Sequence, residues 1–87
     1  NLARTLAIEW TAHRINVNAV APTYAPTPLT EGLFADQRLL QAVLDRTPMA
    51  TLASPESIAE AVAFLSSARA DMITGITLPV DCGWTAW

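Results

Sequence analysis

The chain has 87 residues, 52% hydrophobic and 15% charged, with a formal net charge of −3 at pH 7. Such a length allows one domain at most. The absence of a basic run argues against a nucleic-acid partner, and no apolar run approaches the roughly 20 residues that span a bilayer, so no membrane partner is expected. A chain that is so short and so apolar either buries much of its surface against other chains or is a piece of a larger domain. We favour the second interpretation, a piece of a larger domain.

The first predicted element is a helix over residues 1–12, because Leu2, Leu6 and Trp10 recur on one face. Its start carries little of the usual capping pattern, so we expect the helix to continue upstream. His13 follows the helix, where the helix dipole favours a histidine. Since no triad or metal-ligand spacing surrounds this histidine, we assign it no catalytic role and expect no metal site.

A strand over residues 15–22 comes next, with apolar residues on both faces, as in an inner strand. Pro22 ends the strand because proline cannot donate to a ladder. Three prolines then hold an extended loop that carries the hydroxyls of Thr27 and Thr30. Ligands of open α/β sheets bind outside the carboxyl ends of strands, so this loop is the candidate binding site.

Two further helices are predicted before the next strand. Asp36 caps an amphipathic helix that Thr47-Pro48 stops, and a short helix after a ligand loop is typical of a lid, although ordinary packing explains it equally well. Ser54-Pro55-Glu56 marks the start of the second helix. The predicted buried stripe of that helix comprises Ile58, Ala61, Val62 and Leu65.

The second predicted strand covers residues 76–81, in which apolar and polar residues alternate and Pro79 indicates an edge position. The helical connection between the two strands is the right-handed crossover of a parallel pair. Two parallel strands are too little sheet on their own, so we expect other strands to be supplied from elsewhere. Asp81 is expected to bond its own turn rather than to catalyse, and Cys82 to be a small tolerated residue rather than a reactive thiol.

Three motifs together resemble the short-chain dehydrogenase/reductase family. The first is Arg14–Pro22 followed by Thr27–Thr30, which matches the family's Pro and the Thr five positions later, with Thr23 where the family usually has Gly. The others are Leu52–Glu56 and Thr74–Gly83. The resemblance covers nearly the whole chain and corresponds to the carboxyl-terminal part of the family's fold, without its Gly-rich loop and Tyr-x-x-x-Lys motif.

The resemblance implies a Rossmann-type, doubly wound parallel α/β sheet. Residues 1–87 would be the carboxyl-terminal part of one NAD(P)-binding domain: its last two strands, the end of the catalytic helix, the lid and the last helix. The cofactor would be NAD or NADP, and hydride would pass to or from a small alcohol, ketone or aldehyde. The catalytic Tyr and Lys would lie in the amino-terminal remainder, so no catalytic residue is expected in this chain.

The resemblance also implies contacts for this chain. The nicotinamide ring would lie against Pro22 and Thr23. Its carboxamide would bond the backbone of Ala25 and the hydroxyl of Thr27. The apolar wall of the substrate lid would comprise Leu33, Phe34, Leu40 and Met49.

Two interpretations of the chain's role stay open. It is part of an oxidoreductase, or it is a non-catalytic remnant or oligomerisation piece of that fold. For the oxidoreductase, the expected partners are a small-molecule substrate, the amino-terminal remainder and other subunits in a homotetramer or dimer. The edge strand and the Trp84–Trp87 tail would face a neighbouring subunit. The single cysteine agrees with a reducing, cytoplasmic location.

Overall fold

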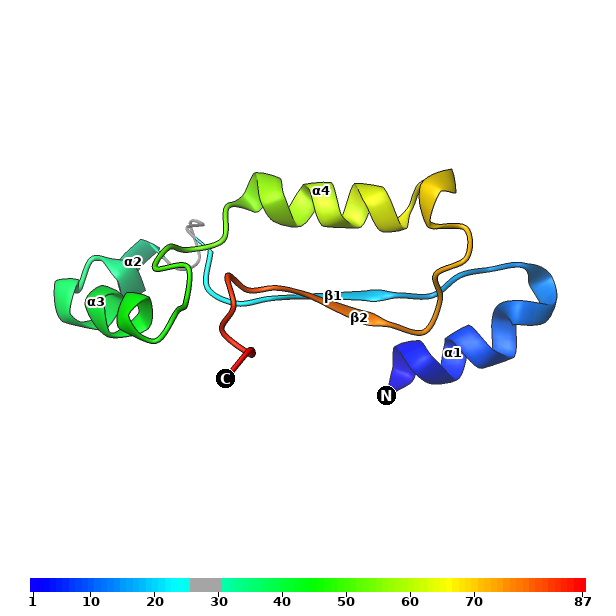
Figure 1. The fold of residues 1–87 in the computed structure, drawn as a ribbon, viewed down its shortest axis with the longest axis horizontal. Helices are drawn as coiled ribbons and strands as arrows, with labels where there is room; N and C mark the ends of the chain where they lie inside the picture. The colour runs from blue at the N-terminus through cyan, green and yellow to red at the C-terminus, as the bar shows by residue number, and fades with distance from the viewer. Residues whose placement is uncertain (26–30) are drawn as a thin grey trace.

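The computed structural model describes residues 1–25 and 31–87, apart from the side chain of Leu33. Figure 1 shows two strands side by side, one helix along them, two helices beyond one end and the first helix near the other. In chain order the elements are α1 (Leu2–Trp10), the 3₁₀ turn η1 (Thr11–His13), β1 (Ala19–Pro22), α2 (Glu31–Phe34), α3 (Gln37–Asp45), α4 (Pro55–Leu65), the 3₁₀ turn η2 (Ala68–Ala70) and β2 (Thr77–Val80).

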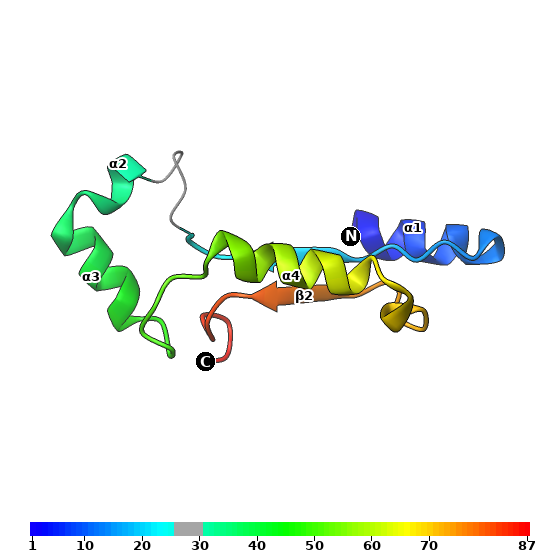
Figure 2. The ribbon, with the colours of Figure 1, turned by 90° about the horizontal axis from the view of Figure 1, so that it is seen from above.

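The two strands form a parallel pair, as predicted, in a register that sets Ala19 against Thr77 and Pro22 against Val80. Figure 2 shows α4 lying over this pair, which is the helical crossover that parallel strands require. Pro22 ends β1 as expected, but both strands are shorter than the predicted ranges 15–22 and 76–81. The amino ends are joined largely through side chains rather than a continuous backbone ladder.

Side chains close the amino ends of three helices. Oδ1 of Asp36 accepts from the backbone N–H of Arg38 at 2.9 Å in α3, and Ser54 accepts from the N–H of Ser57 at 3.0 Å in α4, so both predicted starts are confirmed. Asn1 also caps α1, a stronger signal than the sequence pattern indicated. The helix predicted over residues 1–12 is an α-helix only to Trp10, and the chain then forms the tighter turn η1 over Thr11–His13.

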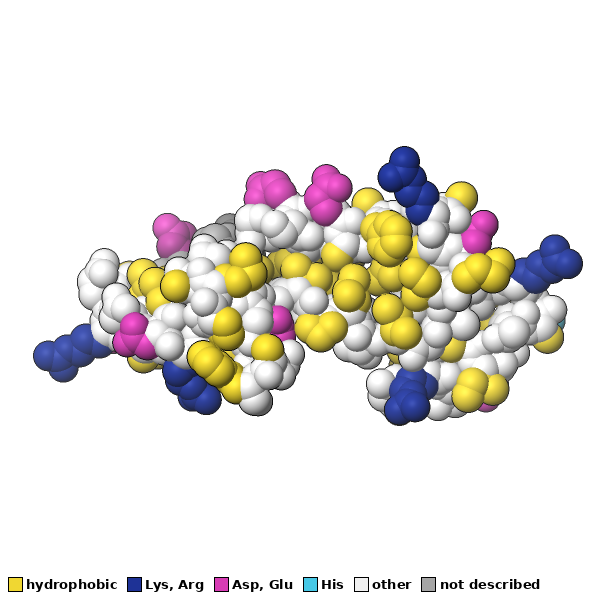
Figure 3. Space-filling model, in the orientation of Figure 1, with side chains coloured by type: hydrophobic (Ala, Val, Ile, Leu, Met, Phe, Trp, Pro, Cys, Tyr) yellow, Lys and Arg dark blue, Asp and Glu magenta, His cyan; other side chains and the backbone are white. Residues whose placement is uncertain are grey.

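The described residues bury little apolar volume. The fully buried apolar residues are small or medium in size, and no large side chain is completely enclosed. Ile58, Ala61 and Leu65 of α4 are half-buried against the strands, but Val62 is 47% exposed, so the predicted buried stripe is wrong at Val62. Figure 3 shows hydrophobic side chains gathered along the middle of the molecule. The buried apolar residues are Ala7, Ala25, Val43, Ala53 and Ala70.

The apolar faces of α1 and α4 are therefore only partly covered. Leu2 and Ile8 of α1 are 73% and 79% exposed, which is unusual for leucine and isoleucine in a packed domain. These faces are available for packing against further protein. In the described residues, none of the helices is both long and apolar enough to cross a membrane.

Candidate functional site

The carboxyl ends of β1 and β2 lie at the same edge of the sheet, since the strands are parallel. Three aromatic side chains meet there: Tyr24 after β1, Phe34 at the end of α2 and Trp84 after β2. The ring centroids of Tyr24 and Phe34 are 5.7 Å apart, and those of Tyr24 and Trp84 are 6.1 Å apart, both edge to face. We call Tyr24, Phe34 and Trp84 the aromatic cluster.

The sequence does not predict this cluster. It predicts Phe34 in the lid and Trp84 in a tail that faces another subunit, and it predicts no role for Tyr24. A signal was present, because Tyr24 and Trp84 both lie just past the end of a predicted strand of a parallel pair. Residues in these positions converge whatever their separation along the chain.

The predicted cofactor residues follow directly from the end of β1. Pro22 is its last residue and is exposed, Thr23 is half-buried, and Ala25 is buried. Within the described residues, the hydroxyl of Thr23 has no hydrogen-bond partner. Thr27 lies outside the described residues. An exposed proline ring beside an unengaged hydroxyl suits a flat ligand with a polar edge, so these residues fit the nicotinamide end of NAD(P).

Asp81 has the local role that its position predicted. The carboxylate is only 7% exposed. Its Oδ2 accepts from the Thr85 hydroxyl at 2.7 Å and from the Thr85 N–H at 3.2 Å, and its Oδ1 accepts from the Gly83 N–H at 3.0 Å. The Thr85 hydroxyl, helped by the backbone N–H groups, holds the pKa of Asp81 below its ordinary value, although desolvation works the other way. Asp81 thus fixes the C-terminal turn.

This C-terminal turn, residues 81–85, packs against the segment after α3. The Met49 N–H donates to the Cys82 carbonyl at 3.1 Å. A Cβ on Gly83 would lie 2.9 Å from the Pro48 ring, and Gly83 has a φ of +91°, so glycine is required there on both counts. Cys82 has a φ of 55°, a left-handed conformation that favours glycine, so its position is less tolerant than the sequence indicated.

The predicted lid residues are dispersed. Phe34 joins the aromatic cluster, and Leu40 is half-buried in α3. Met49 instead lines a cavity of about 550 Å³ between the start of α4 and the end of β2, together with Ser54 and Val80. The side chain of Leu33 lies outside what is described. The structure therefore brings one of the four predicted lid residues, Phe34, into contact with the loop after β1.

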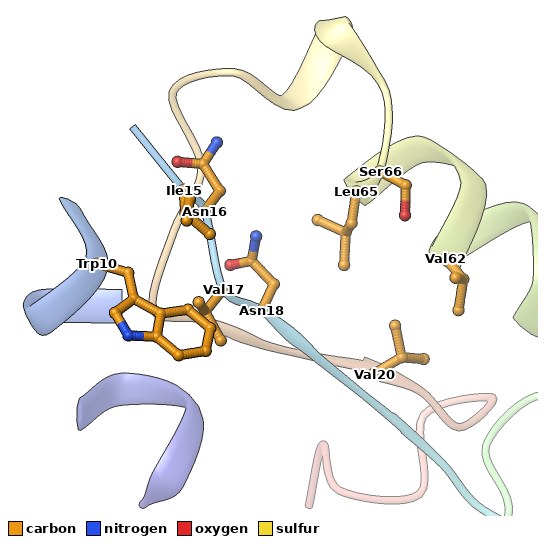
Figure 4. A pocket seen from close by; sticks show the side chains of 9 residues that line it. All are labelled: Trp10, Ile15, Asn16, Val17, Asn18, Val20, Val62, Leu65 and Ser66. Atoms are coloured by element: carbon orange, nitrogen blue, oxygen red, sulfur yellow. The ribbon is translucent and has the colours of Figure 1, made fainter. Parts of the chain in front are cut away.

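A second cavity, of about 590 Å³, lies between β1 and α4 (Figure 4). Trp10, Val20 and Val62 supply apolar walls. The amides of Asn16 and Asn18, which also line it, bond backbone carbonyls of the 70–73 segment. Across the part of the chain that the structure describes, no cluster of His, Cys, Asp or Glu could hold a metal ion. The apolar walls of this cavity suit packing against further protein.

Comparison with known proteins agrees with the fold. A family model described as Enoyl-(Acyl carrier protein) reductase matches residues 1–85. Galactitol 2-dehydrogenase of Rhizobium johnstonii is 46% identical over 87 residues, which are 100% of this chain and 34% of that protein. Cis-4-hydroxycyclohexanecarboxylate dehydrogenase of Sinomonas cyclohexanicum is 51% identical over 86 residues, 99% of this chain and 34% of that protein.

Solved structures match equally well. A candidate 2-deoxy-d-gluconate 3-dehydrogenase of Agrobacterium tumefaciens with bound NADP is 49% identical, with a TM-score of 0.95 over 99% of this chain and 35% of that one. A 4-hydroxyisoleucine dehydrogenase complexed with NADH is 31% identical, also with a TM-score of 0.95, over 99% of this chain and 35% of that one. The chain spans about a third of the length of these relatives. It belongs to the short-chain dehydrogenase/reductase family and has part of that family's Rossmann-type α/β fold.

Proposed function

We propose that the chain is the carboxyl-terminal part of an NAD(P)-dependent oxidoreductase, which passes a hydride between the cofactor and a small alcohol or the corresponding ketone or aldehyde. One observation carries the proposal. The loop after β1 lies at the carboxyl end of a parallel sheet, in a chain that matches an NADP-bound structure over 99% of its length. In this proposal, residues 1–87 belong to a single cofactor-binding domain, whose amino-terminal remainder supplies the catalytic Tyr and Lys.

The uncovered apolar faces support such a remainder. Further strands beside β1 would cover the groove that Trp10 and Val62 line, as parallel sheets require protein on both faces. NAD(P) would supply the hydride acceptor and donor at the nicotinamide ring. The present chain would orient that ring, with Pro22 and Thr23 against its plane and the Ala25 backbone and Thr27 hydroxyl toward its carboxamide. Fixing the ring in this way selects the face that meets the substrate.

The relatives narrow the substrate class. Their names specify galactitol, cis-4-hydroxycyclohexanecarboxylate and L-xylulose, each a small molecule with a secondary alcohol or ketone. We therefore propose a polyol, sugar acid or cyclic alcohol as substrate. A homotetramer or dimer and a cytoplasmic location stay predictions.

A substitution of Thr27 tests this proposal in the full-length protein. Thr27→Val keeps the shape and removes the hydroxyl, so the dissociation constant for NAD(P)H should rise about two- to twelvefold, the worth of one neutral hydrogen bond. Hydride transfer should also slow, while the melting temperature without cofactor stays nearly constant. Thr30→Val, the same change in the same loop, is the control. Unchanged affinity with a lower melting temperature would contradict the assignment of Thr27.

A second candidate function rests on the exposed apolar surface. Ile8 of α1 is 79% exposed and Trp87 of the tail 83%, which suits a non-catalytic assembly piece that retains only the contacts between subunits. Titration of the full-length protein with NADH and NADPH separates the two. The oxidoreductase binds at least one of them and reduces NAD(P)⁺ with a polyol, whereas an assembly piece binds neither and still forms oligomers.

A further inference from the structure

The helices α2 and α3 stand apart from the sheet. Figures 1 and 2 both place them beyond its carboxyl end, away from α4. Ring contacts join this pair to the rest of the molecule at two places. Phe34 of α2 contacts Tyr24 of the loop after β1, and the Arg46 guanidinium at the end of α3 lies 5.2 Å from the ring centroid of Trp84.

Trp84 takes part in both connections. Its ring contacts both the Tyr24 ring and the Arg46 guanidinium. The turn around it is fixed independently, by Asp81 and by the Met49 N–H bond to the Cys82 carbonyl. The Trp87 indole N–H adds a bond to the Arg46 carbonyl at 3.2 Å. The fixed turn over residues 81–85 therefore places the Trp84 ring between Tyr24 of the loop after β1 and Arg46 at the end of α3.

We propose that Trp84 is a positioning residue, which holds α2 and α3 over the substrate site through Tyr24 and Arg46. This inference rests on the proposed function. If the substrate binds only when these helices are in place, its apparent affinity is proportional to the fraction of molecules in that arrangement. Losing the contacts of Trp84 lowers the fraction of molecules that have α2 and α3 in place. A saturating concentration of substrate restores this fraction, so KM should rise and kcat should not change.

Kinetics of the full-length protein give the first test. An aromatic pair and a cation–π contact together account for about a tenfold change in the equilibrium between the two arrangements of these helices. With both arrangements populated in the wild type, Trp84→Ala should raise KM for the alcohol roughly threefold. We expect kcat and the dissociation constant for NAD(P)H to stay within about twofold. Trp84→Phe retains a ring and should restore most of the loss. The control is Met72→Ala, because Met72 is 94% exposed and lies near the amino ends of the strands.

Hydrogen exchange gives a second test, which does not depend on activity. In Trp84→Ala, the amides of α3 should exchange roughly threefold faster than in the wild type, because a tenfold change in the equilibrium is shared between the rise in KM and the rise in the displaced fraction. The amides of α4 and the whole of Met72→Ala should match the wild type. Unchanged exchange in α3 would overturn the proposal, as would an NAD(P)H affinity that falls as much as KM rises. A protein that oxidises no alcohol but shows the faster exchange would refute the proposed function and leave only the positioning of α3 by Trp84 supported.

Discussion

The amino and carboxyl ends of the two strands use polar side chains differently. At the amino ends, Asn18 donates to the Ile73 carbonyl at 3.0 Å and accepts from the Ile76 N–H at 3.2 Å. Asn16 donates to the Asp71 carbonyl at 2.9 Å. At the carboxyl ends, the chain presents an exposed Pro22, a Thr23 hydroxyl that bonds none of the described residues, and the aromatic cluster.

This difference separates stability from binding within one small sheet. The asparagine amides add to the backbone bonds where the strands have not yet paired, so these amides serve to join the chain to itself. At the carboxyl end of β1, the Thr23 hydroxyl bonds none of the described residues. The amino ends should therefore contribute to folding, and the carboxyl end of β1 should determine what the protein binds.

The largest expected effect is on stability, from Asn18→Ala in the full-length protein. The change leaves the Ile73 carbonyl without a partner in a part-buried place and the Ile76 N–H without one in an exposed place, which should lower the free energy of unfolding by about 1–3 kcal/mol. Urea denaturation measures it. The affinity for NAD(P)H should not change.

Asn16→Ala provides the matched control for that prediction. The bond from Asn16 to the Asp71 carbonyl is exposed, so water can replace it, and the bond to the Ala70 carbonyl is long at 3.4 Å, so the loss should be smaller. Equal losses from the two asparagines would contradict the role assigned to Asn18. A weaker affinity for NAD(P)H in Asn18→Ala would erase the distinction between the two ends.

Asp81→Asn should give a smaller, pH-dependent effect. Since the folded state holds the pKa of Asp81 below its ordinary value of 3.8, the carboxylate stabilises the fold above that pH. The contribution is lost as the pH falls through the lowered value. The wild type should therefore unfold at a higher denaturant concentration than Asp81→Asn at pH 7, and the difference should shrink below about pH 4.

Asp71→Asn, an exposed aspartate near the amino ends, serves as the control for Asp81. Its denaturation midpoint should follow that of the wild type over the same pH range. A difference between the wild type and Asp81→Asn that persists unchanged into acid would show that the side-chain shape, rather than the charge, fixes the turn.

Local signals made much of the fold predictable. Asp36 and Ser54 cap helices through bonds to residues two or three positions away, so the sequence alone located both starts. Pro22 likewise marked the end of β1. The parallel crossover followed from the length of the connection between two strand patterns.

Contacts between distant segments made the rest unpredictable. The aromatic cluster joins residues 24, 34 and 84, and Asn18 reaches a segment 55 residues away. The hydrophobic periodicity of the sequence reports local structure, so it predicts neither of these contacts between distant segments. Val62 matched a buried stripe, yet it is 47% exposed because the described part of the chain does not cover it. For the candidate site, position relative to the strand ends was predictable, but the partners of each side chain were not.

Hydrogen exchange of the full-length protein, with and without NADPH and NADH, tests the difference between the two ends of the sheet most directly. Our account predicts that one of the cofactors slows exchange at the amides of Thr23 and Tyr24, and that exchange at Asn16, Asn18 and Ile76 does not change. Slower exchange confined to the amino ends would contradict the account, and so would no change at Thr23 and Tyr24 at a cofactor concentration that saturates the protein.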